Sequence, residues 1–476
     1  MAAPRIVSPE SVESGVAAID AAAFEAFMEP LGPFEPSPRI AIAVSGGPDS
    51  LALCLLADRW TRARRGAAFG LTVDHRLRPE SGAEAAQVRR WLAARGIAHR
   101  TLRWPGARPV TRLQEQARAA RLALLAGWCR RAGILHLLLG HQREDQAETV
   151  LQRFVRGSGI DGLAAMAPCR LAMEPAGGGV RLLRPLLSVS RDALVVTLAR
   201  WDQPWIDDPT NRDARHDRPR LAAALARLGS EGLSASRLAS AAARAAGDRS
   251  ALDELCTDLM ASCALPSPAG FVLLDLSVLR RAPPALAVRA LGCVVSAVSG
   301  SDYPPRRERL DRLARRLLGD GTKATTLGGC RIVPRREGRI VVCREPSAAS
   351  EVLPLAPGES ALWDRRFVVS LSLLAAPGPF VVRRLGTDGL AQVRAMAHRT
   401  GMPLMTDRIP APARPGLPAL FDLDGPLATP HLGFRRASLQ HESGTAEFSV
   451  SFRPARPLAP GLPATLRALP MQDEDS

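Results

Sequence analysis

The sequence has a single lysine, Lys323, among 476 residues, so arginine supplies nearly all of its positive charge. Its eight cysteines include no C-x-x-C pair and have no histidines at zinc-site spacing, which argues against a zinc site and a disulfide framework. No run approaches the ~20 apolar residues of a membrane-spanning helix, and the N-terminus lacks the features of a signal peptide. We therefore expect a soluble cytoplasmic protein with reduced, buried thiols and no membrane partner.

The formal net charge is +16, with a pI near 11, and this excess favours a polyanionic partner such as a nucleic acid. A coding bias toward Ala, Arg, Gly and Pro explains why arginine replaces lysine. It does not explain the excess of 63 basic over 47 acidic residues. Charge alone leaves nucleic acid binding open.

The length predicts two to four domains. An N-terminal extension covers residues 1–38, with a short amphipathic helix over 13–30 and a proline-rich connector. An α/β domain over 39–216 follows, then a mainly helical domain over 217–345 that ends in a pair of hairpins at 324–345. A small α+β domain is expected over 355–452 and a disordered tail over 453–476.

Apolar runs and helical patterns alternate through the first domain, which predicts a doubly wound parallel sheet covered on both faces. Polar segments follow three of the predicted strands, and ligands of such sheets bind outside the carboxyl ends of the strands. These segments therefore favour one common site. The predicted strands are 39–44, 69–74, 98–104 and 134–140, and the predicted helices are 50–64, 82–95 and 112–132.

The first of these polar segments reads SGGPDS and joins a strand to a helix. It consists of Ser45, Gly46, Gly47, Pro48, Asp49 and Ser50. Consecutive backbone N–H groups, two glycines and a helix N-terminus suit a pyrophosphate group, although the GK[ST] ending of a Walker loop is missing. Asp49 would repel phosphate unless a cation lay between them, so we expect it to bind magnesium. The alternative is an ordinary turn with an Asp or Ser cap.

A second candidate group lies on a predicted helix over 141–154, where His141, Asp145 and Glu148 share one stripe. A different, apolar stripe contains Ala147, Val150, Leu151 and Phe154. The alternative is a solvated acidic face capped by a histidine. Arg118 and Arg121 on the preceding helix are likewise either solvated or directed at an anion, and the glycines of 156–159 can simply end the helix.

The loop resembles that of the PP-loop N-type ATP pyrophosphatases, which cleave ATP between the α and β phosphates. Further blocks resemble, in order, those of the tRNA(Ile)-lysidine synthases. They are VDHRLRPESGAEAAQVRRWLAARGIAH (73–99), QEQARAARLALL (114–125), GHQREDQAETVLQRFVRGSGIDGLAAM (140–166), RPLL (184–187) and WIDDPTNRDARHDRPR (205–220). Weaker similarity continues through TLGGCRI (326–332) and the third domain.

The resemblance implies a ligase that modifies the wobble cytidine, C34, of an isoleucine tRNA with a CAU anticodon. ATP, with Mg²⁺, would adenylate the cytosine O2 and release pyrophosphate, and the ε-amine of free L-lysine would then attack C2 and expel AMP. A free ε-ammonium has a pKa of ~10.4, so a carboxylate must hold it and a base must take a proton. The sequence leaves open whether the chain forms a homodimer.

The resemblance also implies roles for individual residues. Arg121 would lie near the phosphates and the target base, and His141, Asp145 and Glu148 would position cytidine and lysine. Residues 45–50 and His75 would bind ATP, with Asp49 as the magnesium ligand. The domains after residue 217 would bind tRNA, together with Arg78, Arg156, Arg218 and Arg220.

The chain departs from the usual family pattern at Leu122, Gln142, Glu144, His216 and Pro219. These departures affect the expected details of tRNA docking more than the expected reaction. Two alternatives remain from the residues alone. A tRNA thiolation enzyme would use the same loop, but it typically needs paired cysteines or an iron–sulfur site to carry sulfur, and the sequence has no C-x-x-C pair. A non-catalytic basic RNA-binding protein would explain the charge, but it needs neither Asp49 nor the acidic stripe.

Overall fold

The computed structural model divides into two compact units, Met1–Ser250 and Ala251–Leu462. The described residues are 5–8, 15–76, 80–104, 113–172, 179–207, 217–229, 231–301, 304–319, 323–373, 378–436, 440–441, 444–445 and 447–460. Over these ranges, no helix is both long and apolar enough to cross a membrane. The first unit includes helix α8 (Asp217–Gly229), which the sequence placed in the second domain. The domain bounds given above stay predictions.

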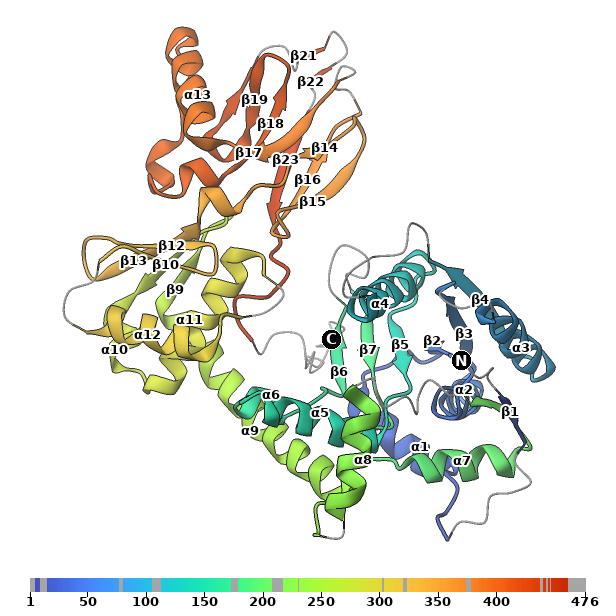
Figure 1. Ribbon diagram of the computed structural model, residues 1–476. Helices are drawn as coiled ribbons and strands as arrows, with labels where there is room; N and C mark the ends of the chain where they lie inside the picture. Colours follow the sequence, from blue (N-terminus) through green and yellow to red (C-terminus); the bar gives the residue numbers. More distant parts are fainter. Residues whose placement is uncertain are drawn as a thin grey trace, which may run out of the picture. The chain divides into compact units, whose positions relative to one another are not determined.

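A six-stranded sheet in the order β4-β3-β2-β5-β7-β6 forms the centre of the first unit (Figure 1). Five strands run parallel, and only β6 is antiparallel to its neighbour β7. The strands are β2 (Arg39–Ala43), β3 (Ala67–Asp74), β4 (Ala98–Arg103), β5 (His136–Leu139), β6 (Cys169–Leu171) and β7 (Arg181–Leu183). The predicted α/β class with a parallel sheet is confirmed.

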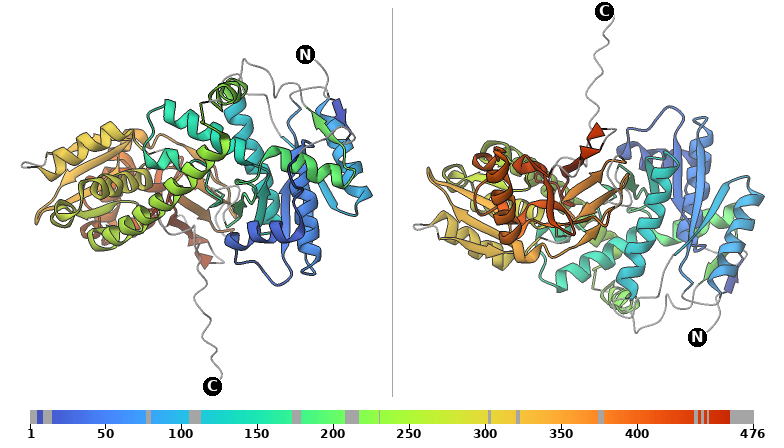
Figure 2. Two further views of the ribbon diagram at one scale, coloured as in Figure 1. Left: turned by 90° about the horizontal axis from the view of Figure 1, so that it is seen from below. Right: turned by 90° about the horizontal axis from the view of Figure 1, so that it is seen from above.

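Helices cover both faces of this sheet (Figure 1 and Figure 2). Ile40 and Ile42 of β2 pack toward the helices α2, α3 and α7, whereas Ala41 between them packs toward α4. Successive strand residues point to opposite faces, so an apolar run with both faces buried is what a doubly wound sheet requires. The helices are α2 (Pro48–Arg62), α3 (Ser81–Ala94), α4 (Leu113–Arg131) and α7 (Arg191–Arg200).

The N-terminal segment contributes to the core of the first unit. Helix α1 (Ala21–Met28) is shorter than the predicted 13–30, because Asp20 caps its N-terminus by accepting a hydrogen bond from the Ala23 backbone N–H at 2.8 Å. Its Phe24 and Met28 are fully buried in the same apolar cluster as α2. Strand β1 (Arg5–Val7) also pairs with β8 (Trp205–Asp207).

The second unit starts with the last part of α9 (Ala235–Cys263) and a five-stranded sheet in the order β11-β12-β13-β10-β9. The predicted hairpins at 324–345 are confirmed, but the sequence missed β9 and β10, which interrupt the helical region. The strands are β9 (Ala264–Pro266), β10 (Val272–Asp275), β11 (Thr325–Leu327), β12 (Cys330–Pro334) and β13 (Arg339–Arg344), with helices α10 (Leu276–Arg281), α11 (Pro284–Ser299) and α12 (Arg307–Leu318).

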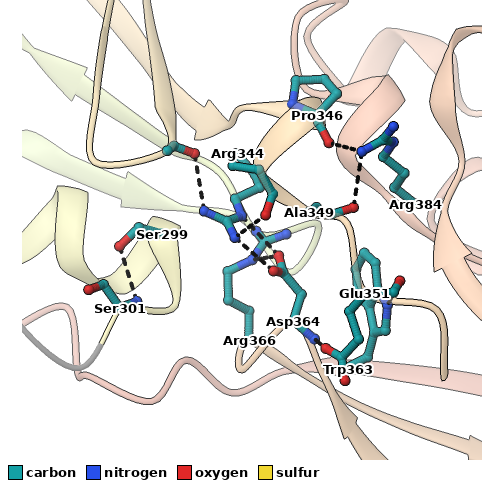
Figure 3. Close-up of polar contacts among 12 residues, drawn as sticks. Ser299, Ser301, Arg344, Pro346, Ala349, Glu351, Trp363, Asp364, Arg366 and Arg384 are labelled. Atoms are coloured by element: carbon teal, nitrogen blue, oxygen red, sulfur yellow. Dashed lines mark hydrogen bonds and ion pairs between the residues drawn. The ribbon is translucent and has the colours of Figure 1, made fainter. Parts of the chain in front are cut away.

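The rest of the second unit has a sheet in the order β14-β17-β18-β19-β20, a three-stranded sheet β15-β16-β23, a small pair β21-β22 and helix α13. Figure 3 shows an ion cluster in which the buried Asp364 accepts hydrogen bonds from the half-buried Arg344 and the buried Arg366. These elements are β14 (Leu353–Pro354), β15 (Ser360–Trp363), β16 (Phe367–Leu371), β17 (Val381–Arg384), α13 (Gly386–Thr400), β18 (Pro418–Asp422), β19 (Gly425–Thr429), β20 (Phe434–Arg435), β21 (Gln440–His441), β22 (Gly444–Thr445) and β23 (Phe448–Phe452).

Candidate active site

The site lies where the strand order reverses. Strand β2 has β3 on one side and β5 on the other, so the connections after β2 and β5 diverge from a common point at the carboxyl edge of the sheet. Open α/β sheets bind ligands at such a point. The predicted phosphate loop follows β2, and the segment with His141 follows β5.

The loop after β2 has a backbone that only glycine suits at its centre. Gly46 has φ +91°, and a Cβ atom there would lie 2.8 Å from Cδ1 of Ile206. The carbonyl oxygen of Gly46 accepts a hydrogen bond from the Ile206 backbone N–H at 2.9 Å, so β8 holds the loop from behind. Helix α2 then begins at Pro48, with Gly47 as its N-cap.

Ser50 is a structural part of this loop. Its buried hydroxyl accepts a hydrogen bond from the Ser45 backbone N–H at 3.1 Å and donates one to the carbonyl oxygen of Gly47 at 3.0 Å. These bonds hold the loop in one conformation. The N-terminus of α2, which is the positive end of the helix dipole, then lies next to the loop. This arrangement suits a phosphate group.

Asp49 fits the role of a magnesium ligand. It lies in the first turn of α2, is half-buried, and its Oδ1 atom is buried. Within the described ranges, no group of three His, Cys, Asp or Glu side chains could form a metal cage. Mg²⁺ seldom needs one, because it usually takes one or two carboxylates and completes its shell with phosphate oxygens and water.

The segment after β5 touches the phosphate loop directly. A Cβ atom at Gly140 would lie 3.2 Å from the carbonyl oxygen of Asp49 and 3.2 Å from the backbone nitrogen of Ser50. Glycine at this position therefore allows the close approach of the two segments. His141 comes next, half-buried and outside the helix, because α5 (Arg143–Val155) begins two residues later. The predicted helical position of His141 is wrong.

The N-terminus of α5 is closed by a capping box. Gln142 is the N-cap, and its side-chain oxygen accepts a hydrogen bond from the Glu144 backbone N–H at 2.5 Å. Oδ2 of Asp145 accepts one from the Gln142 backbone N–H at 3.0 Å. Asp145 therefore has a structural role besides the predicted catalytic one. Glu148, one turn further, is half-buried.

The apolar stripe predicted for α5 is confirmed for three of its four residues. Ala147 and Val150 are buried and Leu151 is partly buried in one cluster with Leu225 of α8. Phe154 does not belong to it, since 67% of its surface is exposed. Arg156 caps the C-terminus of α5 and is exposed, and Gly157 follows with φ +70°, so this glycine ends the helix.

Arg121 and His75 lie close enough for their charges to interact. Burial lowers the pKa of His75, and the positive charge of Arg121 lowers it further. The ring of His75 packs edge-on against Trp104, with the ring centres 5.8 Å apart. Arg121 is half-buried and Arg118 is exposed. The structure thus brings Arg121 of α4 to the residue that follows β3.

Arg184 was not predicted as a site residue. It follows β7 and donates a hydrogen bond from Nε to Nδ1 of His141 at 3.2 Å. Its position directly after a strand, in the RPLL block, is the signal that could have found it. Among the predicted tRNA-binding residues, Arg220 of α8 is exposed, Arg78 lies outside the described residues, and the side chain of Arg218 is likewise not described. The functional roles of all these residues stay predictions.

Comparison with known proteins identifies a family model for the first unit and relatives that cover most of the chain. The family model of the PP-loop domain matches residues 18–228. The chain is 41% identical to the tRNA(Ile)-lysidine synthase of Ruegeria pomeroyi over 360 residues, which are 75% of this chain and 81% of that protein. It is 33% identical to the Caulobacter vibrioides synthase over 401 residues, covering 82% and 86%. It is 50% identical to the Rhodopseudomonas palustris synthase over 224 residues, covering 47% and 63%.

Proposed function

Because the chain belongs to the tRNA(Ile)-lysidine synthase family, we propose that it converts the wobble cytidine C34 of an isoleucine tRNA with a CAU anticodon into lysidine. The observation that carries the proposal is the phosphate loop at the switch point of the sheet, which contains Asp49 and is in contact with the segment between β5 and α5. A PP-loop domain binds ATP. The reaction would take place in the cytoplasm.

The chemistry needs two steps. ATP first adenylates the cytosine O2 and releases pyrophosphate, which turns a poor leaving group into a good one. The ε-amine of free L-lysine then attacks C2, and AMP leaves with the former carbonyl oxygen. The lysine ammonium must lose a proton before the attack, so the site has to hold a cation and accept a proton at neutral pH.

The residues of this chain divide these tasks. The backbone N–H groups of 45–50 would hold the phosphates, and Asp49 would hold Mg²⁺, which neutralises phosphate charge when bound. Arg121 would offset the negative charge that develops as pyrophosphate leaves. Asp145 and Glu148 supply the two carboxylates that lysine binding and proton removal require, and both lie in the first two turns of α5.

The two alternative functions lack this support. A thiolation enzyme typically carries sulfur on paired cysteines or an iron–sulfur site, whereas the eight cysteines here form no C-x-x-C pair, six of them are buried, and Cys169 and Cys293 are half-buried. A non-catalytic RNA-binding protein would have no use for a carboxylate inside a phosphate loop. The curated relatives described above are all named as lysidine synthases.

The decisive experiment mixes the purified full chain, ATP, Mg²⁺, labelled lysine and transcripts of candidate tRNAs. Label is expected in the isoleucine transcript with a CAU anticodon and not in a transcript whose C34 is replaced by U. Pyrophosphate release should depend on that tRNA. Label in neither transcript would reject the proposal, and light scattering on the same preparation tests the homodimer left open by the sequence.

The tRNA-binding arginines can be tested separately. Neutralising even two phosphates makes binding fall about tenfold between 50 and 200 mM salt. Replacing exposed Arg156 or Arg220 with alanine should weaken tRNA binding and reduce the salt slope by about 1 each, with ATP binding unchanged. A salt-insensitive complex would contradict an interaction based on phosphate contacts.

A further inference from the structure

Arg184 lies beside the segment that contains His141 because two strands run in parallel. Strand β7 pairs with β5 in the register Leu183 opposite Leu138. Arg184 is the first residue after β7, and Gly140 and His141 follow the end of β5. Both segments leave the sheet at the same edge, next to the switch point. Only 6% of the Arg184 surface is exposed.

Two further contacts fix Arg184, one made by its guanidinium and one by its backbone. Its Nη1 atom donates to the carbonyl oxygen of Ala167 at 2.7 Å, and its backbone N–H donates to the carbonyl oxygen of Pro168 at 2.8 Å. No carboxylate pairs with Arg184 among the residues that the structure describes. Burial lowers the pKa of Arg184 to about 10, with the charges of Arg170 and Arg118 acting in the same direction. It therefore remains a cation at neutral pH.

This contact decides which nitrogen of His141 carries the proton. An arginine N–H can only donate, so Nδ1 of His141 must accept and its lone pair must be present. The proton of the neutral ring is then on Nε2. A doubly protonated imidazolium would place two N–H groups against each other at 3.2 Å and next to a fixed positive charge. The contact thus disfavours a proton on Nδ1.

We propose that Arg184 is a positioning residue that holds His141 as a neutral Nε2–H donor in the tRNA modification reaction. The proposal rests on the proposed function and deepens it. His141 then binds an acceptor oxygen or nitrogen of the substrate through Nε2 and does not serve as the base that takes the lysine proton. That task falls to a carboxylate of α5. The role of Arg184 is comparable to that of the groups which orient a metal-bound histidine through its second nitrogen.

The tautomer is tested on the free full-length protein by ¹⁵N NMR of labelled histidine, with the His141→Gln spectrum to identify the signals of His141. The wild type is expected to show an unprotonated Nδ1 and a protonated Nε2. Arg184→Met should give a mixture of tautomers, and the exposed Arg200→Met should leave the wild-type signals. A wild-type proton on Nδ1, or signals unchanged in Arg184→Met, would overturn the proposal.

Activity gives the second readout. Arg184→Met should lower kcat for lysidine formation roughly ten- to a hundredfold, with little change in KM for ATP. Arg184→Lys keeps the charge but not the planar donor pair, so it should remain impaired while melting close to the wild type. Wild-type kcat in Arg184→Lys, together with a shifted tautomer, would refute the link to catalysis. If Arg184→Met does not fold, the wild-type spectrum and Arg184→Lys decide.

The two hypotheses fail in different ways. A wild type that shows the expected tautomer but transfers no lysine to any tRNA would overturn the proposed function, and with it the role of His141 in that reaction. An active wild type with the proton on Nδ1 would overturn only the role of Arg184.

Discussion

Asp145 combines a structural and a proposed catalytic role that two substitutions can separate. Its Oδ2 atom accepts the hydrogen bond of the capping box, 3.0 Å from the Gln142 backbone nitrogen. Asparagine retains an oxygen acceptor of the same size and reach but has no charge. Alanine removes the acceptor as well. Asp145→Asn therefore tests the charge, and Asp145→Ala tests the charge and the cap together.

The two roles predict different magnitudes. Loss of a helix cap costs about 1 kcal/mol, which lowers the melting temperature of a unit of this size by about 2–4 °C. We expect this decrease in Asp145→Ala and little or none in Asp145→Asn. Loss of a charged group that contacts the reacting lysine or cytosine costs roughly 2–4 kcal/mol, or on the order of thirtyfold to a thousandfold in rate. We expect this decrease in both variants, and a similar one in Glu148→Gln.

The assay measures lysine transfer to tRNA at saturating ATP over a range of lysine concentrations, with thermal melting of each variant. Asp192→Asn is the matched control, because Asp192 is an exposed aspartate in the first turn of α7. Asp192→Asn should change neither the activation free energy of lysine transfer nor the free energy of unfolding by more than about 0.5 kcal/mol. If Asp145→Asn melts normally and transfers lysine at the wild-type rate, Asp145 only caps α5 and the catalytic assignment is wrong.

Three further substitutions test other parts of the structure. Asp49→Asn should keep the melting temperature and tRNA affinity but abolish Mg²⁺-dependent pyrophosphate release, and full release would reject the metal role. Gly140→Ala places a Cβ atom 3.2 Å from the backbone of Asp49 and Ser50. It should therefore weaken ATP binding in a titration and destabilise the first unit by about 1–3 kcal/mol. An unchanged ATP affinity and an unchanged free energy of unfolding would contradict this close packing. Asp364→Asn leaves the buried Arg366 and the half-buried Arg344 without their carboxylate, and calorimetry should show a loss of about 3 kcal/mol or more. Asparagine tolerates the φ of +48° at this position, so the backbone should not contribute to the loss. An unchanged transition would show that the ion cluster contributes little.

Much of the first unit could be predicted from the sequence because its signals are local. Apolar runs such as 39–44 fill both faces of a parallel sheet, and a glycine-rich turn followed by a helix implies a phosphate loop. The segment before residue 39 was harder to interpret. Its helix buries Phe24 and Met28 against residues of α2, and a sequence pattern does not reveal which partner an amphipathic segment will find.

The site itself was predicted only in part because it depends on contacts between distant residues. The hydrogen bond from Arg184 to His141 joins residues that are 43 positions apart in the sequence. It forms because β7 pairs with β5 in the sheet. Strand order is not encoded in any local pattern. His141 was placed on a helix because periodicity does not mark where a helix begins, and the capping box of Gln142 and Asp145 sets that point.

The packing of α5 also determines how catalysis and tRNA binding can be separated. Ala147 and Val150, on the helix that holds the two carboxylates, are buried against Leu225 of α8 and Leu238 of α9. A truncation after residue 216 would remove both of these helices and expose the apolar face of α5 to water. Full exposure of a valine side chain costs about 1.5–3 kcal/mol and that of an alanine methyl less, so α5 would lose much of its support. Loss of activity in such a fragment would not show that the missing part binds tRNA. Substitution of exposed arginines in the full chain avoids this, because it removes charge and leaves the apolar contacts of α5 intact.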